Sequence, residues 1–561
     1  MRRALGLSLL LLFGGTTSVF AKKKSVTAHL MFGEMQDYKV EDHVADQKLA
    51  KESGIDAFAI NTGHDQYDQE KCRNVFAAAK ETGFPLFFSF DLLHYNQPNA
   101  SNWILYDYLL PYATLDEYYK IDGRVVVSTF SGAQDGSYID DAGSFKEANE
   151  VWQHVIDTAK TFDPPMEIYF VPFWLKMSAI EDEDNQVLEG LSGVGNWLGF
   201  GTVGDKSNVT AERDLEWHDA TTKRGVDYWA GISHSFSVHQ MKTTNNYVHP
   251  GNNWLLATHY RDIIELGDKS PDHIELITWS DWGESTYFSP VRERANEPHQ
   301  DIDSAVYSNT DHDHVPFLRL ATYYNHWFKN GVAPKITQDT IVWWYRGQPA
   351  QAEPANNPIG QPAGADALTD TIWAVVLLPE DTKATKVVIT SGGKEITSET
   401  VSPGVNLIRG EFNVGEQSIA LQDDNGKMII EGSGVDITDK PEWWDYNYFS
   451  YIVPADRVPS DFLDVDGSGG GGETYPTGSS TSTGSPSTST GKSSTPSGYS
   501  TTSSGSGTST SSASSYTPSS TSNWWVVLVL LLFFRVTLLA GGNLIEDIHL
   551  VVIDSVIRND E

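Results

Sequence analysis

Cysteine is almost absent from this chain of 561 residues, in which Cys72 is the only one. A single thiol excludes an intrachain disulfide, so the fold must be held together by its hydrophobic core. Basic residues are also scarce: 39 Lys and Arg stand against 75 Asp and Glu, giving a formal net charge of −36. So acidic a chain repels polyanions, and we expect no nucleic-acid partner. Cys72 lies in a predicted helix, where we expect a small buried hydrophobic residue.

Long apolar segments are missing as well. The apolar run Trp524–Phe534 has 11 residues and is followed by Arg535, whereas a spanning helix needs roughly 20. Small residues at 511–513, a polar spacer and this run resemble a glycolipid-anchor signal, but Gly541–Glu561 adds a charged tail. For residues 524–561 three interpretations stay open: an anchor signal at the membrane or cell wall, a tilted span as far as Ala540, or a misassigned chain end.

Two further segments are predicted to lie outside the folded domains. Residues 1–21 begin with two arginines, continue with a short apolar run and end in small residues, which is the order of a secretory signal peptide. Residues 463–523 are rich in Gly, Ser and Thr and cannot bury enough apolar surface to fold, so they predict a flexible, disordered stalk. We therefore expect a secreted protein, glycosylated at the acceptor sequons that begin at Asn99 and Asn208.

Between residues 22 and 335 short apolar stretches alternate with helical patterns. The predicted strands are Val26–Gly33, Ala57–Gly63, Pro85–Asp91, Arg124–Phe130, Glu167–Trp174, Gly193–Phe200, Asp227–Ser233 and His273–Asp281. The predicted helices are Val40–Ser53, Gln69–Thr82, Trp103–Tyr112, Phe145–Thr161, Thr210–Thr222, Trp254–Leu266 and Val315–Asn330. Eight strands in about 300 residues predict an α/β fold, a (β/α)8 TIM barrel. A doubly wound open sheet is the weaker alternative, because no Gly-rich phosphate loop follows the first strand.

Residues 336–462 have a different pattern, in which short stretches of alternating apolar and polar residues predict strands. Ser391-Gly392-Gly393 and Asp424-Asn425-Gly426 are hairpin signals, so this region predicts a smaller antiparallel β-sandwich domain. One hypothesis is that it binds carbohydrate through Trp343, Trp344 or the pair Trp443-Trp444. The other is that it only packs against the barrel.

The last predicted strand leads into the most informative stretch, HIELITWSDWGESTYFSP. It carries the carboxylates of Asp281 and Glu284 beside Trp279 and Trp282. Indole faces stack on the apolar side of sugar rings, and paired carboxylates supply the acid and base that cleave a glycosidic bond. Taken alone, the spacing also fits a strand end with two solvated acids.

Other polar and aromatic side chains fall at the ends of the predicted strands. In a barrel of this kind the carboxyl ends of the strands carry the chemistry, so these residues are expected to share one rim. They are Asn61, His64, Asp65, Asp91, His94, Trp174, Trp197 and His234.

With these residues in place, the chain resembles glycoside hydrolase family 71, the fungal endo-α-1,3-glucanases or mutanases. The resemblance is carried by VTAHLMFG, SGIDAFAINTG, FFSFD, VVVSTFSG, GNNW, ITWSDWGES and the helix HVPFLRLATYYNHWFKNG. Two places depart from the family: Ser280 stands where it usually has Asn, and the segment after the seventh strand, SHSFSVHQMKTTNNYVHPGNNW, lacks the usual Pro-Trp-Phe start.

The resemblance implies a barrel enzyme that hydrolyses α-1,3-glucan, a polysaccharide of the fungal cell wall, with inversion. Its essential acids would be Asp91, Asp281 and Glu284. We assign Glu284 as general acid, desolvated by Trp279 or Trp282, and Asp281 as base, with Asp91 binding sugar hydroxyls or assisting the base. The candidate substrate-binding residues are Asn61, His64, Asp65, His94, Trp174, Trp197, His234, Trp254, Trp279 and Trp282.

Metal chemistry is not expected. Asp311-His312-Asp313-His314 resembles a metal-ligand cluster, but it directly precedes a predicted helix, so capping explains its acids. We expect a monomer without a metal or other cofactor. Two alternatives for function stay open: a catalytically degenerate glucan-binding wall protein, suggested by the altered segment after the seventh strand, and the same chemistry on another polysaccharide.

Overall fold

The computed structural model describes most of residues 24–464. The described ranges are 24–35, 37–64, 66–93, 98–133, 136–175, 177, 188–201, 209–240, 245–249, 254–292, 312–356, 359–455 and 462–464. The predicted signal peptide, the apolar run Trp524–Phe534 and Asn208 lie outside these ranges, as does the predicted stalk except for its first two residues, Leu463 and Asp464, which form a short strand. Within them, every helix is too short or too polar to cross a membrane.

The first part of the chain forms a mixed α/β fold around a curled sheet of parallel strands. These strands are β1 (Ser25–Met31), β2 (Ala57–Thr62), β3 (Leu86–Asp91), β5 (Arg124–Phe130), β6 (Ile168–Phe173), β7 (Gly193–Asn196), β8 (Asp227–Ile232) and β11 (His273–Leu276). Their order in the sheet is β6-β5-β3-β2-β1-β11-β8-β7, and the short strand β4 (Lys120–Ile121) pairs antiparallel with β5. A parallel bridge from Phe170 to Leu191 also joins β6 to the residues just before β7. The predicted α/β class is thus confirmed, with the parallel strands in one curled sheet, while a complete (β/α)8 barrel stays a prediction.

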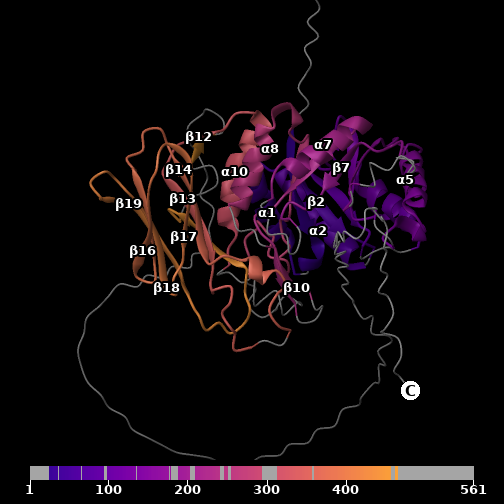
Figure 1. Cartoon of the computed structure of the whole chain (residues 1–561). Helices are drawn as coiled ribbons and strands as arrows, with labels where there is room; N and C mark the ends of the chain where they lie inside the picture. The colour runs from indigo at the N-terminus through magenta and orange to yellow at the C-terminus, as the bar shows by residue number, and fades with distance from the viewer. Residues whose placement is uncertain are drawn as a thin grey trace, which may run out of the picture. The chain divides into compact units, whose positions relative to one another are not determined.

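Helices follow most of these strands and cover the sheet (Figure 1). They are α1 (Val40–Glu52), α2 (Gln66–Thr82), α3 (Ala100–Trp103), α4 (Leu110–Tyr112), α5 (Phe145–Ala159), α7 (Glu212–Arg224), α8 (Leu255–Glu265) and α10 (Val315–Asn330), with a π-helical turn, η2 (Ile104–Leu109), between α3 and α4. Local signals set their ends. The side chain of Ser144 accepts a hydrogen bond from the Glu147 amide at the start of α5, and Gly331 ends α10 in the left-handed conformation. Cys72 is fully buried in α2, as predicted.

The eighth strand is shorter than the sequence predicts. We expected a strand as far as Asp281, but β11 ends at Leu276. Beyond Leu276 the chain folds back on itself: the amide of Thr278 donates to the carbonyl of Thr286, and the amide of Phe288 donates to the carbonyl of Thr278, both at 3.0 Å. Residues Thr278–Ser289 therefore form a folded-back loop, the acid loop, which carries Asp281 and Glu284.

The second part of the chain forms two four-stranded antiparallel sheets, which we call the accessory sheets (orange in Figure 1). One has the order β17 (Gly404–Glu411), β14 (Thr371–Leu378), β13 (Thr340–Arg346), β20 (Tyr448–Val453), and the other has the order β16 (Lys394–Thr400), β15 (Lys386–Ser391), β18 (Gly415–Gln422), β19 (Met428–Ile437). Strands from both sheets contribute to one hydrophobic cluster. Trp343 lies in this cluster, and Trp344 and Trp444 are also buried. The hypothesis that these three indoles bind carbohydrate is therefore wrong, because they pack inside the protein.

Shorter elements connect these parts of the chain. β9 (Ser237–His239) and β10 (Asn246–Val248) pair as an antiparallel hairpin after β8. β12 (Lys335–Ile336) pairs with β21 (Leu463–Asp464), which brings together the chain segments that enter and leave the accessory sheets. The turn η1 (Phe32–Glu34) follows β1 directly.

Replacement of Gly231 by Ala should destabilise the curled sheet. Gly231 lies in β8, and a Cβ atom there would overlap the carbonyl oxygen of Asn196 in β7. Relief of such an overlap requires a backbone shift, so we expect a loss of about 1–3 kcal/mol in unfolding free energy, measured by urea denaturation. Gly33→Ala is the matched control, because a Cβ at Gly33 meets no atom within 4 Å. Equal midpoints for the two variants would contradict the close packing of β7 against β8.

Candidate active site

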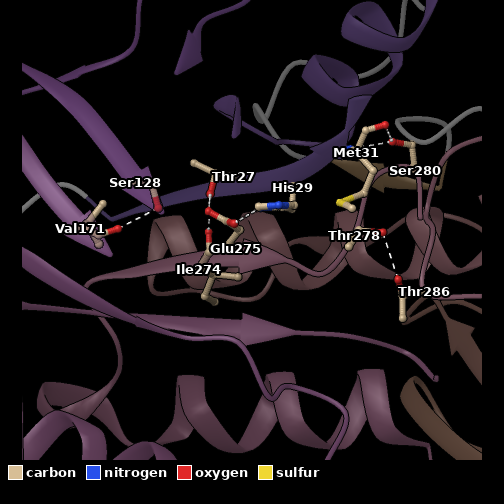
Figure 2. A network of polar contacts seen from close by, with 10 residues as sticks. All are labelled: Thr27, His29, Met31, Ser128, Val171, Ile274, Glu275, Thr278, Ser280 and Thr286. Carbon is tan, nitrogen blue, oxygen red and sulfur yellow. Dashed lines mark hydrogen bonds and ion pairs between the residues drawn. The ribbon is translucent and has the colours of Figure 1, made fainter. Parts of the chain in front are cut away.

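A buried polar network joins β1 to β11 inside the curled sheet (Figure 2). The carboxylate of Glu275 accepts a hydrogen bond from the hydroxyl of Thr27 at 3.2 Å, and its other oxygen lies 2.8 Å from Nδ1 of His29. All three side chains are fully buried. Burial of a carboxylate costs free energy unless it has hydrogen-bond partners. The network therefore holds β1 and β11 in their relative positions just before the acid loop begins.

The acid loop continues this attachment to β1. The amide of Met31 donates to Oγ of Ser280 at 3.0 Å, and the amide of Trp279 donates to the carbonyl of His29 at 2.6 Å. Ser280, which departs from the family pattern, therefore holds the loop to the end of β1 (Figure 2). Within the loop, Oγ1 of Thr278 accepts the amide of Asp281 at 2.8 Å, and the hydroxyls of Thr278 and Thr286 are 3.0 Å apart.

Asp281 and Glu284 meet in this loop. The amide of Glu284 donates to Oδ1 of Asp281 at 2.8 Å. The side chain of Asp281 is 7% exposed, and Glu284 is partly buried. A backbone N–H that points at a carboxylate stabilises its ionised form, which favours a charged Asp281.

Glu284 has the opposite electrostatic environment. Burial raises the pKa of Glu284 well above its usual range, and the negative charges of Asp281 and then Glu34 raise it further. One carboxyl group of the pair thus tends to keep its proton while its neighbour tends to stay ionised. A general acid and a general base that act together require this difference in protonation state. Burial desolvates Glu284, as we expected; that Trp279 or Trp282 provides this burial stays a prediction.

Glu34 is a functional candidate that the sequence analysis missed. It ends the turn η1 after β1 and is partly buried. The signal was available, since Glu34 directly follows the predicted strand Val26–Gly33, at the end where rim side chains gather. Its influence on Glu284 depends on β1 lying next to β11 in the sheet, which the sequence does not show.

Tyr247 is the second residue that the sequence analysis missed. It belongs to β10, and its hairpin partner β9 is tied to the acid loop because the amide of Ser237 donates to the carbonyl of Glu284 at 3.1 Å. Burial raises the pKa of Tyr247, and the charges of Glu284 and Asp281 add to this effect. Its phenol is therefore neutral and lies within electrostatic reach of the two acids.

Asp91 and Asn61 lie at the same end of the sheet as the acid loop. Asp91 is the last residue of β3 and is 3% exposed; its Oδ1 accepts the amide of Leu93 at 2.9 Å. Asn61 lies in β2 and pairs in register with Ser89 of β3. In the sheet order β3-β2-β1-β11, these two strands lie on the far side of β1 from β11, the strand that leads into the acid loop.

The other predicted rim residues occupy different environments. His64 is partly exposed, stacks on Trp103 with ring centres 5.1 Å apart, and lies 3.0 Å from the carboxylate of Asp107. Trp197 packs edge-on against His29 and Phe130, with ring centres 4.6 and 4.7 Å away. Trp174 is buried against Phe145 of α5. Asp65 and His94 lie outside the described residues.

Two of the predicted sugar-stacking tryptophans are buried behind the acid loop. Trp279 is fully buried, and its indole N–H donates to Oδ2 of Asp46 in α1 at 3.0 Å. Trp282 is 2% exposed and lies near Tyr38, with ring centres 6.0 Å apart. The prediction that these two indole faces stack on sugar is corrected, because neither face is open. The side chains at alternate positions of a folded-back loop point toward the helix layer as well as toward the rim.

Trp254 and His234 both contact other parts of the fold. The indole N–H of Trp254 donates to the carbonyls of Ala374 and Ile408 in the accessory sheets, at 2.9 and 3.0 Å, while the residue stays partly exposed. His234 is buried and stacks on Phe317 of α10 with ring centres 4.2 Å apart. Burial lowers the pKa of His234 to about 3, so its ring is neutral. The prediction that His234 contacts substrate is corrected to a structural role, and that for Trp254 stays a prediction.

The predicted capping role of the sequence before α10 is confirmed for Asp313. Its Oδ1 accepts the amide of Val315 at 3.1 Å. His312 lies 3.0 Å from the carboxylate of Asp445, while the ring nitrogens of His314 each lie 3.1 Å from a backbone carbonyl. The three side chains thus turn to different partners, and Asp311 lies outside the described residues.

The free energy of unfolding should report the raised pKa of Glu284. Glu titrates at about 4.3 in an unfolded chain, whereas the folded protein keeps this proton to higher pH. The unfolded state therefore binds fewer protons between these two pKa values, and the group's contribution to stability is lost as pH rises through that window. Glu284→Gln should remove this loss, measured as a shallower fall of the urea midpoint above about pH 4.3.

The control for this measurement is Glu41→Gln, an exposed carboxylate in the first turn of α1. It should leave the pH dependence as in the wild type. A Glu284→Gln protein whose stability followed the wild-type pH dependence would contradict the raised pKa.

Comparison with known proteins identifies the family of the chain. Residues 22–461 match glycosyl hydrolase family 71. A mutanase of Penicillium rubens is 27% identical over 434 residues, which are 76% of this chain and 88% of that protein. A glucan endo-1,3-alpha-glucosidase of Schizosaccharomyces pombe is 26% identical over 460 residues, 80% of this chain and 99% of that protein. An ascus wall endo-1,3-alpha-glucanase of the same yeast is 25% identical over 305 residues, 53% of this chain and 66% of that protein. The resemblance seen in the sequence is confirmed: the chain belongs to glycosyl hydrolase family 71 and is a glycoside hydrolase.

Proposed function

We propose that this protein is an endo-acting hydrolase of the α-1,3-glucosidic bonds of fungal cell-wall α-1,3-glucan. The observation that carries the proposal is the pair of acids in the acid loop, in which the amide of Glu284 donates to Asp281 while burial and the charge of Asp281 raise the pKa of Glu284. The substrate follows from the relatives, whose names describe a mutanase and glucan endo-1,3-alpha-glucosidases.

In this mechanism Glu284 is the general acid and Asp281 the general base. Glu284 donates its proton to the glycosidic oxygen as the bond to the leaving sugar breaks. Asp281 takes a proton from a water molecule that attacks the anomeric carbon from the opposite face, so the configuration inverts. The amide that donates to Asp281 and the burial of Glu284 set these two protonation states before substrate arrives.

Asp91, Asn61 and His64 are the remaining substrate-side candidates in the described residues. Asp91 lies near the rim on β3, where a carboxylate can bind sugar hydroxyls or assist the base. Together with the (β/α)8 arrangement of the curled sheet, these positions give a site lined mainly by polar groups rather than by stacked indoles. The accessory sheets act as a β-sandwich domain that packs on this barrel.

The same proposal places the protein outside the cell. The sequence of residues 1–21 favours secretion, and the stalk with its apolar end favours tethering at the cell surface or wall. One of the relatives is named for the ascus wall. We propose that the enzyme works as a monomer on an insoluble polysaccharide.

Loss of either acid should abolish most of the hydrolysis. Asp281→Asn and Glu284→Gln keep the size of the side chain but remove the acid or base, so we expect kcat on insoluble α-1,3-glucan to fall about 10²- to 10⁴-fold. Release of reducing ends measures the rate. Glu41→Gln is the control and should match the wild type, and full activity in either acid variant would overturn the assignment.

A panel of α-glucans, β-glucans and chitin separates the remaining functions. We expect turnover on α-1,3-glucan, with polarimetry showing the inverted anomer first. Hydrolysis of another member of the panel would reassign the substrate and keep the mechanism. Binding to glucan without turnover on any polymer would instead favour a degenerate wall-binding protein.

Glu34→Gln should shift the pH profile without removing activity. Its charge helps to raise the pKa of Glu284, so its loss lowers that pKa. Activity requires protonated Glu284 and falls as pH rises through the pKa, so the alkaline limb of kcat/KM should move to lower pH. The pH–rate profile measures the shift. An alkaline limb unchanged from that of Glu41→Gln would contradict the contribution of Glu34.

A further inference from the structure

A loop of the accessory sheets forms backbone hydrogen bonds with the β9–β10 hairpin. The loop, residues Ile359–Leu368, lies between β13 and β14, and we call it the docking loop. The amide of Val248 donates to the carbonyl of Ala363 at 2.8 Å, and the amide of Ala363 donates to the carbonyl of Asn246 at 2.9 Å. Ala363 thus pairs with Tyr247 as a parallel β-bridge. The accessory sheets therefore add a strand-like edge to the hairpin.

Side chains strengthen the same contact. Nδ2 of Asn246 donates to the carbonyls of Ile359 and Gly360, both at 3.1 Å. Val248 is fully buried in a small cluster with Ala365, Trp444 and Tyr446. The apolar cluster and the backbone hydrogen bonds lie at the same part of the hairpin. The hairpin is therefore held both by apolar burial and by directed hydrogen bonds.

The docking loop is itself fixed to the accessory sheets. Nε2 of Gln361 donates to the carbonyl of Ala350 at 2.9 Å and lies 3.0 Å from the hydroxyl of Tyr446. That hydroxyl also donates to the Ala350 carbonyl at 2.7 Å. A loop tied in this way is a rigid support rather than a free surface segment.

The β9 strand of the hairpin contacts the acid loop. The amide of Ser237 donates to the carbonyl of Glu284 at 3.1 Å. The ring of Tyr247 stacks on that of Phe236, with centres 5.1 Å apart and planes inclined by 10°. The amide of His249 donates to the carbonyl of Phe236 at 3.2 Å. These contacts fix the direction of the Tyr247 ring.

We propose that the docking loop is a positioning element of the active site, which holds the β9–β10 hairpin so that Tyr247 presents its hydroxyl to Asp281 and Glu284. The accessory sheets are then part of the catalytic apparatus rather than a separate binding module. The proposal rests on the proposed function for the roles of the two acids. Tyr247 acts through those acids, because a neutral hydroxyl that donates to a carboxylate favours its ionised form.

Gly364→Ala tests the docking loop in the full-length protein. Gly364 has φ +89°, and a Cβ atom there would overlap the carbonyl oxygen of Val248. Gly393→Ala is the matched control: it lies in the accessory sheets with φ +75°, so it carries the same backbone strain, but its Cβ meets no atom within 4 Å. We expect Gly364→Ala to lower kcat by about 10- to 100-fold through misplacement of catalytic groups, and Gly393→Ala to keep the wild-type kcat.

Amide hydrogen exchange in the absence of substrate gives a readout that does not depend on activity. Peptides that cover the hairpin and the acid loop should exchange faster in Gly364→Ala than in Gly393→Ala. Unchanged exchange and unchanged kcat in Gly364→Ala would overturn the positioning role. If Gly364→Ala does not fold, Tyr247→Phe carries the test.

Tyr247→Phe removes the hydroxyl and keeps the ring on Phe236. Without this donor the ionised base is less favoured, so its pKa rises and the acidic limb of the pH–rate profile moves to higher pH, with a lower kcat and little change in KM. Tyr345→Phe is the control, since it removes a buried hydroxyl that donates to the Val435 carbonyl in the accessory sheets. A pH profile of Tyr247→Phe that matched that of Tyr345→Phe would overturn the role of the hydroxyl.

The two proposals can fail separately. A wild-type protein that hydrolyses no glucan, while Gly364→Ala still loosens the acid loop, would refute the proposed function and keep the coupling. Normal hydrolysis by the wild type and by both Gly364→Ala and Tyr247→Phe would keep the function and refute the coupling.

Discussion

The electrostatic cost of two carboxyl groups in one partly buried loop shapes the rest of this structure. Asp281 and Glu284 are three residues apart, and each ionised carboxylate disfavours the other. Within the loop, a backbone amide donates a hydrogen bond to Asp281, while burial and the charge of Glu34 favour the protonated form of Glu284. The two carboxyl groups therefore favour different protonation states. That difference is what general acid–base hydrolysis of a glycoside uses.

Such a pair is useful only if the loop cannot relax, and three parts of the chain prevent this. The end of β1 binds the loop through Met31 and Ser280. The hairpin binds it from β9, and the accessory sheets reach it through Asn447, whose side-chain amide donates to the hydroxyl of Tyr287 at 3.1 Å. Segments more than 100 residues apart thus converge on one short loop, at an entropic cost that the folded core offsets.

The aromatic residues serve this rigidity more than they serve recognition. A sequence with 17 tryptophans suggests a sugar-stacking surface. Instead Trp229, Trp279, Trp343 and Trp373 are fully buried, and Trp254 donates its N–H to the accessory sheets. In a chain with a single cysteine, large rings provide the apolar burial that holds separate layers together.

The sequence by itself determined the alternating α/β order, the extent of helix α10, the buried Cys72 and the presence of two acids next to each other in one stretch. These follow from local periodicity, capping and spacing, which neighbouring residues encode. Only the tertiary structure decided that β11 stops before the acids, that Trp279 turns toward Asp46, and that Glu34 and Tyr247 stand beside Glu284. Burial and charge proximity depend on which strands and loops become neighbours, and a linear pattern does not contain that information.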